Sequence, residues 1–245
     1  MTPRLTAWQK EIEALGGTPV VLVPVTTTPE NTLTIPAAFP GRAVVARLLG
    51  DEAFVVQLLR AHALTVTLSE AGQRYSFVLL NQARAADWEG DPEGLLGHEL
   101  GHLWLQALGY RSPAASAGDP CLATFAGDIV QHILIRDELR RRGIGYDAFW
   151  TRLQTAWLAG PPVALPADRC GRLQLLAAWM DAALGYTDAE WPARGRYLQH
   201  LRAQYPSLAP YADTLAGKLG DRVLWDRSLY AWALGRVLNV LSSIE

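Results

Sequence analysis

The chain has 245 residues, of which 50% are apolar and 19% are charged, and its formal net charge is −2. This composition is too apolar for a disordered chain. The slightly negative net charge excludes an overall basic surface of the kind that binds nucleic acid. No apolar run approaches the roughly 18 residues that a membrane-spanning helix needs. Two cysteines, Cys121 and Cys170, can form one bridge but are too few for a disulfide framework. The sequence therefore predicts a cytoplasmic protein that binds neither nucleic acid nor membranes.

The apolar pattern predicts alternating helices and strands over the first 61 residues. Apolar residues spaced three to four apart predict helices over residues 4–15 and 51–61. Between these helices, a short apolar run predicts a buried strand over residues 19–25. A polar loop follows this strand and is expected to contain a short strand at residues 32–35.

A β-hairpin is predicted next, over residues 63–80. Leu64, Val66 and Leu68 alternate with threonine residues, which is typical of a strand with one buried face. A turn at residues 71–74 leads into a second apolar strand at residues 75–80. The two strands are expected to pair with each other.

Two long helices follow the hairpin. The first is expected over residues 92–108, because Asp91-Pro92 supplies an N-cap followed by proline and Gly109 supplies a stop. The second is expected between a repeat of this start signal at Asp119-Pro120 and a stop at Gly143.

Helical periodicity dominates the rest of the chain. The N-terminal part thus mixes helices and strands, whereas the C-terminal part is helical. We predict an α+β fold with a mixed domain over residues 1–145 and a helical C-terminal region over residues 146–245 that packs on it.

The first long helix contains the sequence HELGH, which is the motif that points to chemistry. His98 and His102 are four residues apart and therefore share one helical face, so their imidazoles can converge on one tetrahedral ion. Glu99 lies at the edge of this face, where it can reach a metal-bound water and act as a general base. The motif predicts a zinc site on this helix.

These residues resemble the zincin metallopeptidases, whose signature is HExxH on the active-site helix. The resemblance covers about residues 60–145 and implies bound Zn²⁺, a peptide or protein substrate, and Glu99 as the catalytic base. Leu105 and Leu108 stand where the metzincin branch needs glycine and histidine. The absence of a cysteine before His98 also excludes a deformylase-like ligand set. A gluzincin-like arrangement remains, in which a later helix supplies the third ligand.

Two residues of the second helix are candidates for this third zinc ligand. Asp128 and His132 are one turn apart in a stripe at helical spacing that is otherwise apolar, so both are expected to face the core. Burying them there is costly unless they pair with each other or bind metal. We favour His132 as the ligand, with Asp128 accepting its second N–H, although the reverse assignment stays open. Cys121, on the same stripe, is interpreted as a small buried apolar residue.

The resemblance also suggests how a substrate would bind. In zincins the strand before the active-site helix is a sheet edge that borders the cleft, so Tyr75–Leu80 is expected to be an edge strand to which an extended peptide can add. The alternative function is a regulatory or binding protein with a zincin-like fold and little turnover. The helical C-terminal region would then offer the surface for a protein partner.

Overall fold

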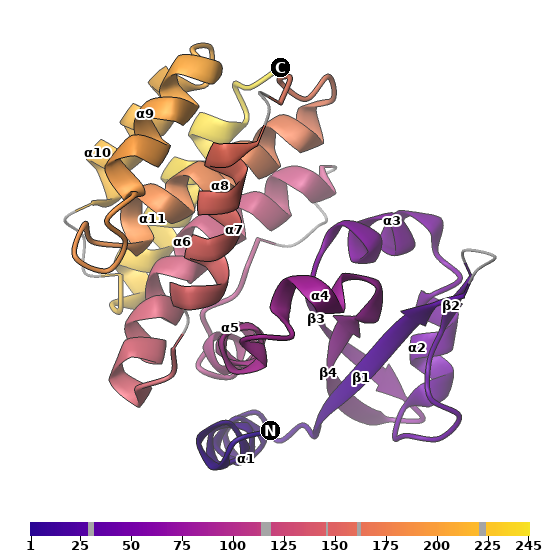
Figure 1. The fold of residues 1–245 in the computed structure, drawn as a ribbon. Helices are drawn as coiled ribbons and strands as arrows, with labels where there is room; N and C mark the ends of the chain where they lie inside the picture. The colour runs from indigo at the N-terminus through magenta and orange to yellow at the C-terminus, as the bar shows by residue number, and fades with distance from the viewer. Residues whose placement is uncertain (29–31, 114–118, 146, 161–162, 221–223) are drawn as a thin grey trace. The chain divides into compact units, whose positions relative to one another are not determined.

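The computed structural model describes residues 1–28, 32–113, 119–145, 147–160, 163–220 and 224–245. Within these residues the chain has an α+β fold, with eleven α-helices, one short 3-10 helix and a four-stranded mixed sheet (Figure 1). The fold divides into two compact units. We call residues 1–109 and 139–149 the αβ unit, and residues 110–138 and 150–245 the helical unit.

The sheet of the αβ unit has the strand order β2-β1-β4-β3. The strands are β1 (Val20–Thr27), β2 (Leu33–Thr34), β3 (Ala63–Glu70) and β4 (Gln73–Asn81). β4 pairs in parallel with β1 and in antiparallel with β3, while β1 also pairs in antiparallel with β2. The predicted hairpin is therefore confirmed, and β4 is a central strand.

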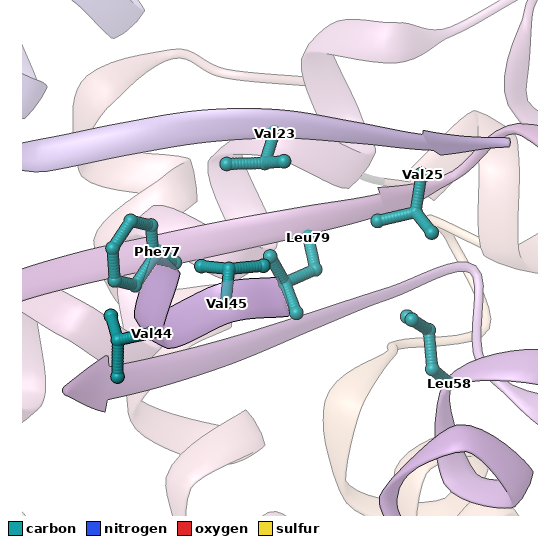
Figure 2. Packing of buried hydrophobic residues seen from close by; sticks show 7 residues of the cluster. All are labelled: Val23, Val25, Val44, Val45, Leu58, Phe77 and Leu79. Carbon is teal, nitrogen blue, oxygen red and sulfur yellow. The ribbon is translucent and has the colours of Figure 1, made fainter. Parts of the chain in front are cut away.

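One hydrophobic cluster of the αβ unit lies between one face of the sheet and two short helices. These helices are α2 (Arg42–Leu48), which the sequence pattern did not indicate, and α3 (Glu52–Arg60), which it did. Figure 2 shows side chains of β1 and β4 gathered against these helices; the buried cluster consists of Val23, Val25, Val44, Val45, Leu58, Phe77 and Leu79. Because side chains alternate along a strand, Ser76 and Val78 of β4 face the opposite side.

Helices α1 (Pro3–Gly16) and α5 (Pro92–Ala107) pack against each other in the αβ unit, and α5 also contacts β3 and β4. Two short elements, η1 (Gln82–Arg84) and α4 (Ala85–Trp88), connect β4 to α5. Trp8 and Trp104 meet edge to face with ring centroids 6.2 Å apart. Glu11 accepts a hydrogen bond from the Trp104 indole at 3.1 Å and pairs with Arg142 at 2.9 Å. The N-terminal helix thus holds α5 in place.

The helical unit is built from six helices. They are α6 (Pro120–Arg142), whose last turn belongs to the αβ unit, followed by α7 (Asp147–Ala159), α8 (Arg169–Gly185), α9 (Arg194–Gln204), α10 (Ala209–Leu219) and α11 (Arg227–Leu241). α8 contacts both α9 and α10, and α10 contacts α11. The predicted helices at 92–108 and 120–143 are confirmed within one or two residues as α5 and α6.

Helices α6 and α8 run parallel and in register. Cys121 forms a disulfide with Cys170, and His132 pairs with Asp181, each across a sequence separation of 49 residues. The same offset relates Arg136 to Gly185, where an added Cβ would collide with the guanidinium group. Three contacts with one offset define a parallel pair, because both positions advance together along the two helices.

The disulfide corrects the interpretation of Cys121 as a small buried apolar residue. Both cysteines are half-buried, and among the described residues neither thiol is free. The pairing depends on the register of α6 and α8, which local sequence patterns do not encode. The argument from cysteine content to a reducing cytoplasm therefore loses its basis, and the cytoplasmic location stays a prediction.

The two compact units are bounded differently from the predicted domains 1–145 and 146–245. Residues 110–138 group with the helical unit instead of the N-terminal one. The disulfide and the His132–Asp181 pair tie α6 to α8, and Gln131 donates a hydrogen bond to the Tyr230 hydroxyl at 3.3 Å. None of the helices in the described ranges is long and apolar enough to cross a membrane.

Candidate metal centre

Helix α5 begins as the sequence predicts and carries the HELGH residues in its middle. The Asp91 side chain caps the helix by accepting a hydrogen bond from the Gly94 N–H at 3.2 Å, and Pro92 follows in the first turn. The helix is buried over most of its length, including His98 and Glu99, which are 5% and 6% exposed. The site residues are therefore held on a rigid element.

The two histidines of α5 point their ring nitrogens at each other. The Nε2 atoms of His98 and His102 lie 3.2 Å apart, and their rings are nearly perpendicular, at 87°. Two ligand nitrogens of a tetrahedral zinc site with bonds of 2.0–2.1 Å lie about 3.3 Å apart. The spacing of this pair therefore suits a shared metal ion.

Close packing beside His98 fixes the end of α6 against α5. A Cβ added at Gly97 would lie 2.9 Å from Cδ2 of Leu139 and 3.0 Å from Cγ2 of Ile144, so glycine is needed for this approach. His132 lies seven residues, or about two turns, before Leu139. It therefore lies on the same face of α6 as Leu139.

His132 is oriented by a carboxylate of α8. Its Nδ1 lies 2.9 Å from an Oδ1 atom of Asp181, so the ring donates from Nδ1 and its Nε2 lone pair is available to a metal. Arg136, only 2% exposed, contacts the Asp181 carboxylate and donates to its backbone carbonyl at 2.9 Å. The Arg136 guanidinium also stacks over the Tyr186 ring, 4.6 Å from its centroid.

The two buried carboxylates near His132 differ in their pKa. Burial alone would raise the pKa of Asp181, but the positive charge of Arg136 and the contact with His132 hold it at about 2. Burial raises the pKa of Asp128 to about 6, with the charge of Asp181 adding to the rise and His132 opposing it. At neutral pH Asp181 is thus the firmly ionised partner of His132.

Among the described residues, three of the predicted ligands form a group that could hold a metal ion. The ligand atoms of His98, His102 and His132 all lie within 4.8 Å of one another. Asp128 is not part of this group. The partner of His132 is Asp181, so the prediction that Asp128 would accept its second N–H is wrong. The periodicity of α6 could not reveal a contact with a different helix.

The prediction that Tyr75–Leu80 is an edge strand is also wrong. Tyr75–Leu80 lies within β4, whose two edges pair with β1 and β3. An extended peptide therefore cannot add to this strand. The hairpin pattern revealed only the pairing with β3, because the parallel pairing with β1 joins segments more than 50 residues apart.

Sequence reasoning missed Asp181, Arg136 and Gly185. One signal for Asp181 was present: it is a single carboxylate in the otherwise apolar segment LLAAWMDAALG, and burying a lone charge there requires a partner. Arg136 and Gly185 carried no such local signal, because their roles depend on the register of α6 and α8.

Comparison of the chain with protein families, curated proteins and solved structures finds no match.

Proposed function

We propose that this protein is a zinc-dependent hydrolase of the zincin type, with His98, His102 and His132 as the metal ligands. The observation that carries the proposal is the grouping of three histidine ligand atoms within 4.8 Å, two of them supplied by an HExxH sequence on one helix. Three neutral imidazoles leave one position of a tetrahedral zinc ion for water or substrate, which is typical of catalytic zinc sites.

The chemistry of the donor set fits zinc. Imidazole nitrogen is a standard zinc ligand, and histidine ligands of catalytic zinc commonly donate their other N–H to a carboxylate. Asp181 provides this carboxylate for His132. Asp128 lies outside the group of three histidine ligand atoms, so we do not include it in the donor set.

Glu99 is the residue we propose as general base. Bound zinc would polarise a substrate carbonyl and make a coordinated water more acidic. Glu99 follows the first ligand on the buried face of α5, so its carboxylate can take the proton from the attacking water. It then passes this proton to the leaving amine, which completes the hydrolysis of a peptide bond.

The proposed substrate is an extended peptide. Since β4 is paired on both sides, this peptide needs a different sheet edge. β3 has a strand partner only on its β4 side among the described residues. β3 also contacts α5, and the Thr67 hydroxyl of β3 donates to the Gln106 side chain of α5 at 3.2 Å. We propose that the open edge of β3 pairs with the substrate main chain.

A second candidate function is a binding or regulatory protein that uses the same metal site without turnover. The central position of β4 favours it, because the strand expected to receive a substrate is covered on both edges. Glu99 favours the hydrolase over the binding protein, since a purely structural zinc site needs no general base.

Metal analysis of the purified protein tests the proposal. We expect about one zinc per chain in the wild type, and loss of most of it in His98→Ala, His102→Ala and His132→Ala. His62→Ala is the matched control, because His62 pairs with Asp87 in the αβ unit and should not affect zinc content. Absence of zinc from protein exposed to zinc, or its retention in the three ligand variants, would contradict the proposed site.

A further inference from the structure

Asp128 of α6 is an acidic side chain that the proposed mechanism does not use. It lies one helical turn before His132, so the two side chains share a face of the helix, with Cβ atoms about 5–6 Å apart. Both His132 and Asp181 act electrostatically on its carboxylate. Since these residues are the proposed third ligand and the partner of that ligand, the Asp128 carboxylate lies on the side of α6 that faces the metal centre.

This carboxylate has no cationic partner. None of the described residues forms a hydrogen bond or an ion pair with Asp128, whereas the neighbouring Asp181 contacts both Arg136 and His132. Burial is the main cause of the raised pKa of Asp128, and only the charge that His132 can carry opposes it. Leaving a carboxylate in such a position is costly, which indicates that a bound cation completes the site.

A ligand can reach the Asp128 side chain. Asp128 is half-buried, and so is His132 one turn later. The next two residues of α6, Ile129 and Val130, are only 3% and 0% exposed. The accessible strip of this part of the helix therefore includes both the unpaired carboxylate and the proposed zinc ligand.

The distance from the ligand restricts the kind of cation. In a peptide, the α-amino nitrogen lies only about 2.5 Å from the carbonyl carbon of its own residue. When that carbonyl is the scissile one at the metal centre, a free amino group comes close to a carboxylate one turn away from a ligand. The side chain of lysine or arginine carries its charge several carbon atoms further away and fits this position less well.

We propose that Asp128 binds the free α-ammonium group of a peptide substrate, which confines hydrolysis to the N-terminal residue. This inference rests on the proposed function, because the zinc ligands place the scissile carbonyl. It adds the substrate class, which is a peptide with an unblocked N terminus, cleaved as by an aminopeptidase. Asp128 is thus a substrate-binding residue and takes no proton from the attacking water.

Hydroxamates test this proposal without requiring turnover, because a hydroxamate group binds zinc in place of the scissile carbonyl. The hydroxamate of L-leucine carries a free α-amino group, that of isocaproic acid has the same carbon skeleton without it, and that of N-acetyl-L-leucine has it blocked. Isothermal titration calorimetry measures their binding to the zinc-loaded full chain near neutral pH. Wild type is expected to bind the leucine probe at least about tenfold more tightly than the other two, because only a free ammonium group can form a charged hydrogen bond with Asp128.

Two variants locate the source of this preference. Asp128→Asn should reduce it to about twofold or less, while the affinity for the isocaproic probe stays within about twofold of wild type and so shows that the metal centre is intact. Asp188→Asn is the matched control. It makes the same chemical change in the helical unit, at a carboxylate that pairs with Arg194, and should keep the full preference for the leucine probe.

Three results overturn the proposal while leaving the metal centre in place. Equal or tighter binding of the acetylated probe by wild type would indicate a substrate that continues on its N-terminal side. An unchanged preference in Asp128→Asn would mean that the amino group binds elsewhere, and an equal loss for all three probes would assign Asp128 to the metal itself. Failure of wild type to hold zinc or to bind any of the probes contradicts the proposed function, and this inference falls with it.

Discussion

Asp181 of α8 accepts a hydrogen bond from Nδ1 of His132 on α6, at a distance of 2.9 Å. Asp181→Asn should lower zinc affinity by about 10- to 100-fold, because the amide orients the imidazole less strongly and does not raise its basicity. Competition with a chromophoric chelator measures this change. Asp128→Asn should have a clearly smaller effect, and an equal loss in both variants would contradict the role of Asp181.

Glu99→Gln separates metal binding from catalysis. The variant should keep its zinc, because Glu99 is proposed as a base and not as a ligand, but it should lose hydrolysis of any substrate by at least about a hundredfold. Zinc content and peptide cleavage are measured on the same preparation. Unchanged cleavage would remove Glu99 from the mechanism, and loss of zinc would make it a ligand or structural residue.

Gly185→Ala should disturb the pair that supports His132. The added Cβ would collide with the guanidinium of Arg136, which is buried against Asp181 and cannot move at low cost. We expect the free energy of unfolding to fall by about 2 kcal/mol or more, measured by urea denaturation. In contrast, Gly235→Ala on α11 meets no atom within 4 Å and should be neutral or slightly stabilising.

Asp128 should make the metal-free protein less stable at neutral pH. The pKa of Asp128 is about 6 in the folded protein, which is above its value in the unfolded chain. The contribution of the neutral carboxyl group to the free energy of unfolding is therefore present below about pH 4 and is lost as the pH rises through 6. Asp128→Asn should therefore raise the free energy of unfolding at pH 7.5 by up to about 3 kcal/mol. Chemical denaturation with a chelator present should show no such gain at pH 4.

Removal of the disulfide should lower the free energy of unfolding by an amount set by the logarithm of the length of the loop that it closes. The bridge spans 49 residues, and the chain-entropy treatment gives about 4 kcal/mol for a loop of this length. The Cys121→Ser, Cys170→Ser double variant should unfold at correspondingly lower denaturant concentration. A thiol reductant should shift the wild type toward the variant and leave the variant itself unchanged. A shift of similar size in both proteins would assign the effect of the reductant to something else.

Local patterns were sufficient to predict α5 and the placement of His98 and His102 on one of its faces. The Asp91-Pro92 start, the Gly109 stop and the four-residue spacing of His98 and His102 all belong to one continuous segment. His132 could also be singled out from the sequence, because a polar residue in an apolar stripe needs a partner. These predictions depended on the periodicity of single helices, which the sequence records directly.

Pairing between distant segments could not be predicted in the same way. Asp181 supports His132 only because α6 and α8 are parallel and in register, and the same register joins Cys121 to Cys170. β4 is central only because β1, far earlier in the chain, pairs with it in parallel. Each of these contacts is specified by packing over the whole unit, and no short stretch of residues records it.

The parallel arrangement of α6 and α8 also has a consequence for proteolysis. Parallel neighbours cannot be joined by a tight turn, so the chain returns through the long connection that contains α7. A single protease cut in α7 would leave His132 on the N-terminal fragment and Asp181 on the C-terminal fragment. The Cys121–Cys170 bridge would keep the two fragments in one molecule. Such a nicked protein should run as one band on a denaturing gel without reductant and as two bands with it.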